Sequence, residues 1–93
     1  MKQTELFYLT DCPYCINANK AIEELVRENP AYAQIAILRI EESKEPELAE
    51  SRDYYYVPTL FYKGEKMYEA KPSHSYGIIK QSLREAFDRV LAE

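Results

Sequence analysis

The pattern of hydrophobic and polar positions predicts seven elements along this chain, and the first three form one unit. Thr4–Leu9 is apolar on both faces, which predicts a central strand, and Ile35–Ile40 predicts a second buried strand. Pro13–Glu28 carries apolar side chains at helical spacing, and Asn29–Pro30 ends this helix. The inward residues of the helix are Ala18, Ala21, Ile22 and Leu25. A strand, a crossover helix and a second strand of these lengths predict a right-handed unit with parallel strands.

The second half of the chain predicts a short helix, a hairpin and a long closing helix. We expect these elements at Pro46–Arg52 for the short helix, Thr59–Tyr62 and Lys66–Glu69 for the hairpin strands, and Ser75–Leu91 for the closing helix. Leu48 and Ala49 face inward from the short helix, and Gly64 provides the tight turn of the hairpin. Ser73 or Ser75 offers an N-cap for the closing helix. The inward face of that helix carries Ile79, Leu83, Ala86, Phe87 and Val90.

The order β-α-β-α-β-β-α predicts an α/β fold, and 93 residues suffice for one domain, which we expect to span residues 1–93. No segment approaches the roughly 18 apolar residues that cross a membrane, so we expect no membrane partner. The chain begins with polar residues, unlike a signal peptide, which predicts a cytoplasmic protein. The net charge is −4, with Lys and Arg scattered among Glu, which argues against nucleic acid as a partner. We expect a monomer.

Cys12 and Cys15 are the only cysteines of the chain, and they stand directly after the first expected strand. Pro13 suits the first position of the helix that follows. The N–H groups and the dipole of a helix N-terminus favour the thiolate, which is the reactive form of cysteine. Cys15 lies one turn beyond Cys12 on the same helix face, so it can attack a mixed disulfide formed at Cys12. The spacing therefore indicates a redox pair.

Two other interpretations of the cysteines stay open at this point. A structural zinc site normally has four protein ligands, and besides carboxylates the chain supplies only Cys12, Cys15 and His74. A metal or cluster site would therefore need a second chain or carboxylate ligands. The cysteines could also be inert residues that fall at this spacing by chance. Redox chemistry is favoured because a C-x-x-C motif beside a βαβ pattern is typical of redox proteins.

Two local motifs resemble known families. Residues 7–15, FYLTDCPYC, resemble the active-site entry of glutaredoxins, whose usual motif is C-P-Y-C, and Val57-Pro58-Thr59 resembles the step before the third strand in the thioredoxin-like superfamily. Residues 58–83 are closer in layout to thioredoxins. The resemblance covers essentially the whole chain and implies a thioredoxin-like fold, with a four-stranded mixed sheet flanked by helices. It also implies a cis bond before Pro58 and a third strand antiparallel to the first, with Cys12 next to Pro58.

The function implied by this resemblance is that of a thiol-disulfide oxidoreductase active in cell redox homeostasis. Cys12 and Cys15 would form its redox-active disulfide and act as its catalytic residues. Tyr14, exposed between the cysteines, would contact substrate together with Val57, Pro58 and Thr59. The expected partners are disulfide-containing proteins or low-molecular-weight thiols, together with a reductase or thiol that recycles the oxidised form. No bound cofactor and no metal are expected.

The chain also differs from both relatives, and two other functions remain open. Leu9 stands where glutathione-binding glutaredoxins usually carry lysine, and Tyr68-Glu69-Ala70 replaces their Gly-Gly…Asp stretch. Leu6 stands where thioredoxins carry a buried aspartate. One alternative is a dimer that binds an iron–sulfur cluster, as some glutaredoxins do. The other is a non-catalytic module that binds extended peptides at its proline edge.

Overall fold

The computed structural model describes residues 2–93, so Met1 of the predicted domain lies outside the described residues. The chain forms an α/β domain with a four-stranded mixed sheet flanked by helices, which confirms the predicted class. Its elements are β1 (Lys2–Tyr8), α1 (Pro13–Glu28), the 3₁₀-helix η1 (Pro30–Gln34), β2 (Ile35–Glu41), α2 (Pro46–Glu50), β3 (Thr59–Tyr62), β4 (Glu65–Glu69) and α3 (Tyr76–Ala92). None of the helices among the described residues combines the length and the apolar character that crossing a membrane requires.

The strands lie in the order β2-β1-β3-β4. β1 pairs with β2 in parallel, as predicted for two strands joined by a crossover helix, and β3 runs antiparallel to both β1 and β4. In the β1–β3 register, Phe7 near the end of β1 faces Thr59 at the start of β3. The residues that follow β1 and those that precede β3 therefore leave the sheet at the same edge.

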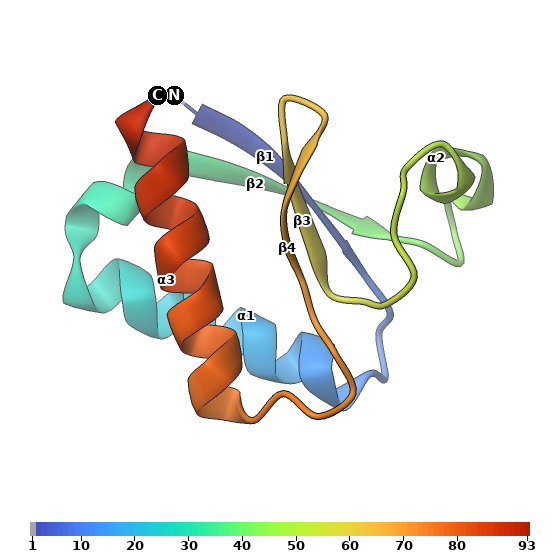
Figure 1. The fold of residues 1–93 in the computed structure, drawn as a ribbon, viewed down its shortest axis with the longest axis horizontal. Coiled ribbons are helices and arrows are strands. Elements are labelled where there is room, and N and C mark those ends of the chain that lie inside the picture. The colour runs from blue at the N-terminus through green and yellow to red at the C-terminus, as the bar shows by residue number, and fades with distance from the viewer. Residues whose placement is uncertain (1) are drawn as a thin grey trace.

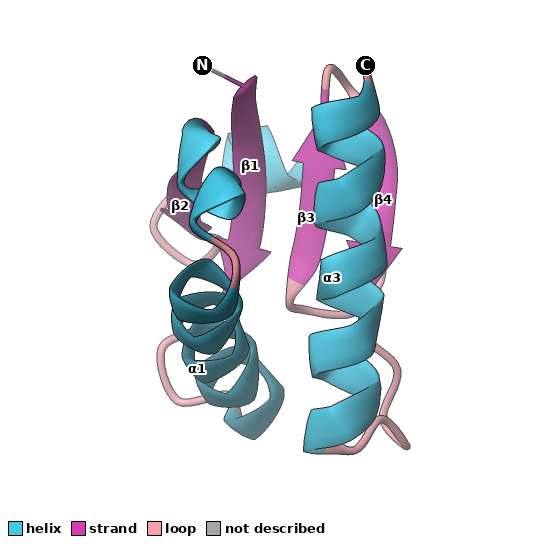
Figure 2. Cartoon of the chain, turned by 90° about the vertical axis from the view of Figure 1, so that its left-hand side faces the viewer, coloured by secondary structure: helices cyan, strands magenta, loops and turns pink. Residues whose placement is uncertain are grey.

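The helices form two layers around this sheet. α1 and α3 lie side by side over one face, whereas α2 lies on the other side (Figure 1). Figure 2 shows α1 in front of β2 and β1, and α3 in front of β3 and β4. The two ends of the described chain meet, since the Lys2 ammonium donates to the backbone carbonyl of Glu93.

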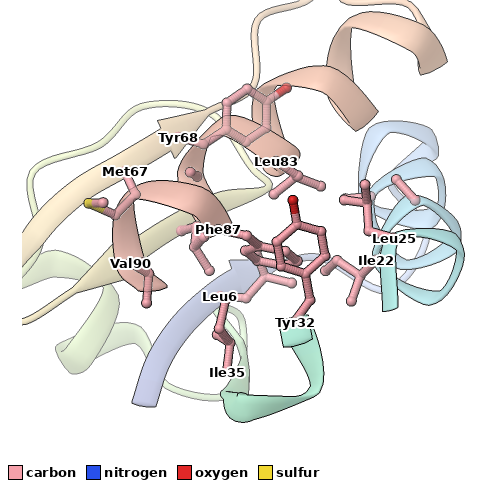
Figure 3. Packing of buried hydrophobic residues seen from close by; sticks show 14 of the residues in the cluster. Leu6, Ile22, Leu25, Tyr32, Ile35, Met67, Tyr68, Leu83, Phe87 and Val90 are labelled. Carbon is pink, nitrogen blue, oxygen red and sulfur yellow. The ribbon is translucent and has the colours of Figure 1, made fainter. Parts of the chain in front are cut away.

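The larger core lies between the sheet and the α1–α3 layer (Figure 3). Every inward residue predicted for these two helices is buried, because the apolar stripe of each helix repeats with the helical period. A smaller cluster covers the opposite face of the sheet: Phe7, Ile40 and Phe61, with the half-buried Leu48, Ala49, Tyr54 and Val57 packed against them. This second cluster supports the segment that leads to Val57.

Some predicted boundaries and burials need correction. β1 begins at Lys2 and ends at Tyr8, β2 and β4 are each one residue longer than expected, and α2 ends at Glu50. β2 is not buried throughout, because it forms an edge of the sheet; Leu38 is half exposed and Arg39 is exposed. The apolar run that predicted a buried strand does not distinguish an edge strand from a central one.

Two local signals act as expected. The Ser75 hydroxyl accepts a hydrogen bond from the N–H of Ile78 and caps α3. Lys63 and Gly64 both have positive φ, 52° and 80°, as a two-residue turn between antiparallel strands requires. Glycine adopts this conformation without the steric cost that a side chain would bring.

Candidate dithiol site

Cys12 lies at the sheet edge where β1 ends, as the N-cap residue of α1. Pro13 occupies the first turn of the helix, where a missing N–H has no cost. The Cys12 side chain is half buried, and its Sγ lies 3.8 Å from the carbonyl oxygen of Val57. Backbone N–H groups without helical partners and the positive end of the helix dipole surround such a position, which favours a thiolate there.

Cys15 lies one turn deeper and is buried, with 2% of its surface exposed. The backbone N–H of Leu9 points at its sulfur at 3.5 Å. Burial raises the pKa of Cys15 to about 12, and the neighbouring Cys12 and Glu42 add to this rise, while the Leu9 N–H opposes it. Both cysteines are free thiols in the structure. One thiol is therefore reachable from solvent, and the other is held protonated behind it.

Val57 and Pro58 form the other side of the site, and the peptide bond between them is cis, as predicted. They lie 45 residues after Cys12, yet the strand register brings them beside it. Figure 1 shows the segment before β3 close to the start of α1. No group of residues 2–93 accepts a hydrogen bond from the Val57 N–H. This backbone group is thus available to a bound peptide.

Three contacts hold this turn from behind. The Thr59 hydroxyl donates to the carbonyl of Tyr56, and the N–H of Ala70 donates to the carbonyl of Pro58 at 3.0 Å. Glu69 accepts the N–H groups of Tyr55 and Tyr56. The side chains of Pro58 and Thr59 are fully buried. The expected substrate contact through the Thr59 side chain is therefore wrong, because its hydroxyl is directed into the turn.

Tyr14 is half buried, so the exposed position predicted for it is also wrong. Its ring packs against the larger core, and its hydroxyl donates to the carbonyl of Pro72 in the loop before α3. In the same loop, His74 stacks on Tyr68, with hydrogen-bonding atoms 2.9 Å apart. Tyr14 thus ties the C-P-Y-C segment to the β4–α3 loop.

A shallow hollow of about 390 Å³ opens beside Cys12. Its lining residues are Leu9, Thr10, Asp11, Cys12, Glu41 and Ser43. Glu41 accepts two hydrogen bonds from Ser43, whose hydroxyl and backbone N–H lower the pKa of the Glu41 carboxyl. The hollow is large enough for the side chain next to a substrate cysteine.

Within residues 2–93, no three or more His, Cys, Asp and Glu side chains lie close enough together to hold a metal ion. His74 is instead engaged with Tyr68 and with the backbone N–H of Lys71. The structure therefore does not assemble the cysteines and His74 into a common ligand set.

Comparison with known proteins places the fold but not the activity. Neither a protein-family model nor a curated protein matches the chain. Among solved structures, the chain is similar to one described as "Structure of a malarial protein", with a TM-score of 0.59. The similarity covers 90% of this chain and 94% of that chain at 15% sequence identity. At this identity it shows a shared fold alone.

The sequence pattern did not indicate the part that Glu69 plays in the site. Glu69 ends a short strand next to two lysines, and its position resembles an ordinary exposed surface charge. In the structure its side chain is 6% exposed. The partners that bury it, Tyr55 and Tyr56, lie in an irregular segment whose path no periodicity predicts.

Proposed function

We propose that this protein is a thiol-disulfide oxidoreductase with a thioredoxin-like fold, and that Cys12 and Cys15 are its redox pair. The observation that carries the proposal is the arrangement of the two thiols. Cys12 caps a helix at the surface, Cys15 is buried one turn below, and the backbone of Val57 faces Cys12 across the site. The C-P-Y-C motif and the cis proline support the same function by resemblance.

In the first step, the Cys12 thiolate attacks one sulfur of a substrate disulfide. A bond forms between Cys12 Sγ and that sulfur, the substrate S–S bond breaks, and the other substrate sulfur leaves as a thiolate. Cys15 then loses its proton and attacks Cys12 Sγ. The mixed disulfide breaks, the second substrate sulfur leaves, and a Cys12–Cys15 disulfide remains. The substrate gains two electrons, and an external thiol or reductase must return them.

The difference in burial assigns the two roles. Cys12 is the thiol that a substrate can reach, whereas Cys15 is shielded and its pKa is raised to about 12. A thiol held protonated does not compete with Cys12 for the first attack, because the thiolate is the nucleophile. Once Cys12 carries the substrate sulfur, Cys15 is the nearest thiol to it. An extended substrate can use the Val57 backbone as the edge of an added strand.

Insulin reduction, with dithiothreitol as electron source, tests this proposal. We expect the protein to accelerate insulin precipitation, Cys12→Ser to abolish the acceleration, and Cys15→Ser to accumulate a mixed disulfide. Absence of acceleration by the unsubstituted protein would refute the proposal. Two further measurements separate the alternatives: visible absorbance after anaerobic reconstitution with iron and sulfide, and retained peptide binding by the Cys12→Ser, Cys15→Ser double variant.

A further inference from the structure

Glu69 is a nearly buried carboxylate that holds the segment before the cis proline. It is the last residue of β4 and lies opposite Thr59 in the β3–β4 register. Its Oε2 accepts the backbone N–H of Tyr55 at 2.6 Å and that of Tyr56 at 2.8 Å. Its Oε1 accepts from the Lys66 ammonium at 2.8 Å. Both oxygens are therefore engaged, one by the segment and one by its own strand.

The two peptide groups held by Glu69 directly precede the site. Residues 51–58 form no helix or strand, so the sheet ladder does not determine their path. Val57 follows Tyr56 in the chain, and its carbonyl oxygen lies 3.8 Å from Cys12 Sγ. A carboxylate that fixes the Tyr55 and Tyr56 N–H groups thus sets where the Val57 backbone stands relative to the thiol. Hydrogen bonds to a charged acceptor are shorter and stronger than neutral ones, and these two show such lengths.

We infer that Glu69 is a positioning residue, which places the Val57 backbone for an extended protein substrate through the peptide groups of Tyr55 and Tyr56. This inference rests on the proposed function and assigns it a residue outside the C-P-Y-C motif. Glu69 itself does not touch the reacting sulfurs. Its charge is retained because Lys66 pairs with it and Lys71 lies 3.8 Å away.

A comparison of two substrates tests this role. Insulin presents its disulfide on an extended chain that the Val57 edge can bind, whereas hydroxyethyl disulfide has no backbone to dock. For Glu69→Ala we expect KM for insulin to rise about tenfold or more, since two charge-assisted hydrogen bonds that place the edge are lost. The rate with hydroxyethyl disulfide should stay within about twofold, because the cysteines are unchanged. Glu69→Gln, which keeps an acceptor oxygen, should restore part of the insulin KM.

Two control variants separate positioning from loss of charge or stability. Glu65→Gln removes a carboxylate from an exposed position on the same strand. Tyr32→Phe removes a 2.6 Å hydrogen bond to Asp88 near the far end of α1, and thus destabilises the fold away from the site. Neither variant should change KM for insulin. Hydrogen exchange of the Tyr55 and Tyr56 amides, which needs no activity, should accelerate in Glu69→Ala alone.

The possible outcomes distinguish this inference from the proposed function. No insulin reduction by the unsubstituted protein would overturn the proposed function, and the inference with it. Normal reduction with an unchanged insulin KM in Glu69→Ala would overturn the inference alone. An equal loss with insulin and hydroxyethyl disulfide, or unchanged exchange of the two amides, would also overturn it, since the effect would then not run through the segment.

Discussion

Replacing Glu69 by glutamine should remove a part of the stability that depends on pH. Burial raises the pKa of Glu69, but the Lys66 ion pair and the N–H groups of Tyr55 and Tyr56 outweigh this effect and lower it from 4.5 to about 2. A carboxyl whose pKa is lower in the folded state stabilises the fold above its unfolded pKa. This stabilisation is lost as the pH falls from 4.5 through about 2.

The size of the effect follows from these two values. The interval of about 2.5 pKa units corresponds to about 3 kcal/mol at neutral pH, at 1.36 kcal/mol per unit. At pH 3 the unfolded carboxyl is protonated, whereas the folded one is still largely ionised. About 2 kcal/mol of the contribution is therefore lost between pH 7 and pH 3. A glutamine has no charge to lose, so the stability gap between the two proteins should narrow by this amount.

Urea unfolding followed by circular dichroism at pH 7 and at pH 3 measures this gap. Other carboxylates titrate in both proteins and cancel in the difference between them. Glu65→Gln, an exposed substitution on the same strand, controls for the removal of a charge. A gap for Glu69→Gln that stays the same within about 0.5 kcal/mol would refute the reasoning, because the carboxylate would then not be held in its ionised form by the fold.

Three further predictions concern the thiols and the core. Cys15→Ser should accumulate a mixed disulfide with a substrate peptide at Cys12, seen by intact mass spectrometry; no adduct would contradict the assigned roles. Iodoacetamide at neutral pH should alkylate Cys12 and spare Cys15, because Cys15 is buried and its pKa is raised to about 12; peptide mapping with equal labelling of both would refute this. Leu83→Ala should lower the free energy of unfolding by about 2–5 kcal/mol, since Leu83 is fully buried between α3 and the sheet; a loss below about 1 kcal/mol in urea unfolding would contradict its place in the core.

Helices were the most predictable part of this protein. α1 begins and ends at the predicted residues, and α3 differs by one residue at each end. Long apolar stripes with a proline or serine at the start leave little freedom, because only one face of each helix can be buried. The hairpin turn at Gly64 was equally predictable from local chemistry.

The strands and the site were predictable only in part. The apolar run of β2 predicted burial, but the position of β2 at the edge of the sheet exposes Leu38 and Arg39. Tyr14 was expected at the surface, yet its hydroxyl reaches the Pro72 carbonyl, 58 residues further along the chain. Thr59 was expected near substrate, but its hydroxyl closes the turn onto Tyr56. Each difference comes from a partner that is distant in sequence or in an irregular segment.

The sequence by itself determined the α/β class, the helix faces and the pair of cysteines at a helix start, because periodicity, capping and spacing act over a few residues. Only the tertiary structure decided that Cys15 is buried behind Cys12, that Val57 faces the thiol, and that Glu69 holds the segment before Val57. These arrangements depend on strand register and on the path of a segment without regular structure. Their physical basis is contact between residues far apart in the chain, which no local pattern encodes.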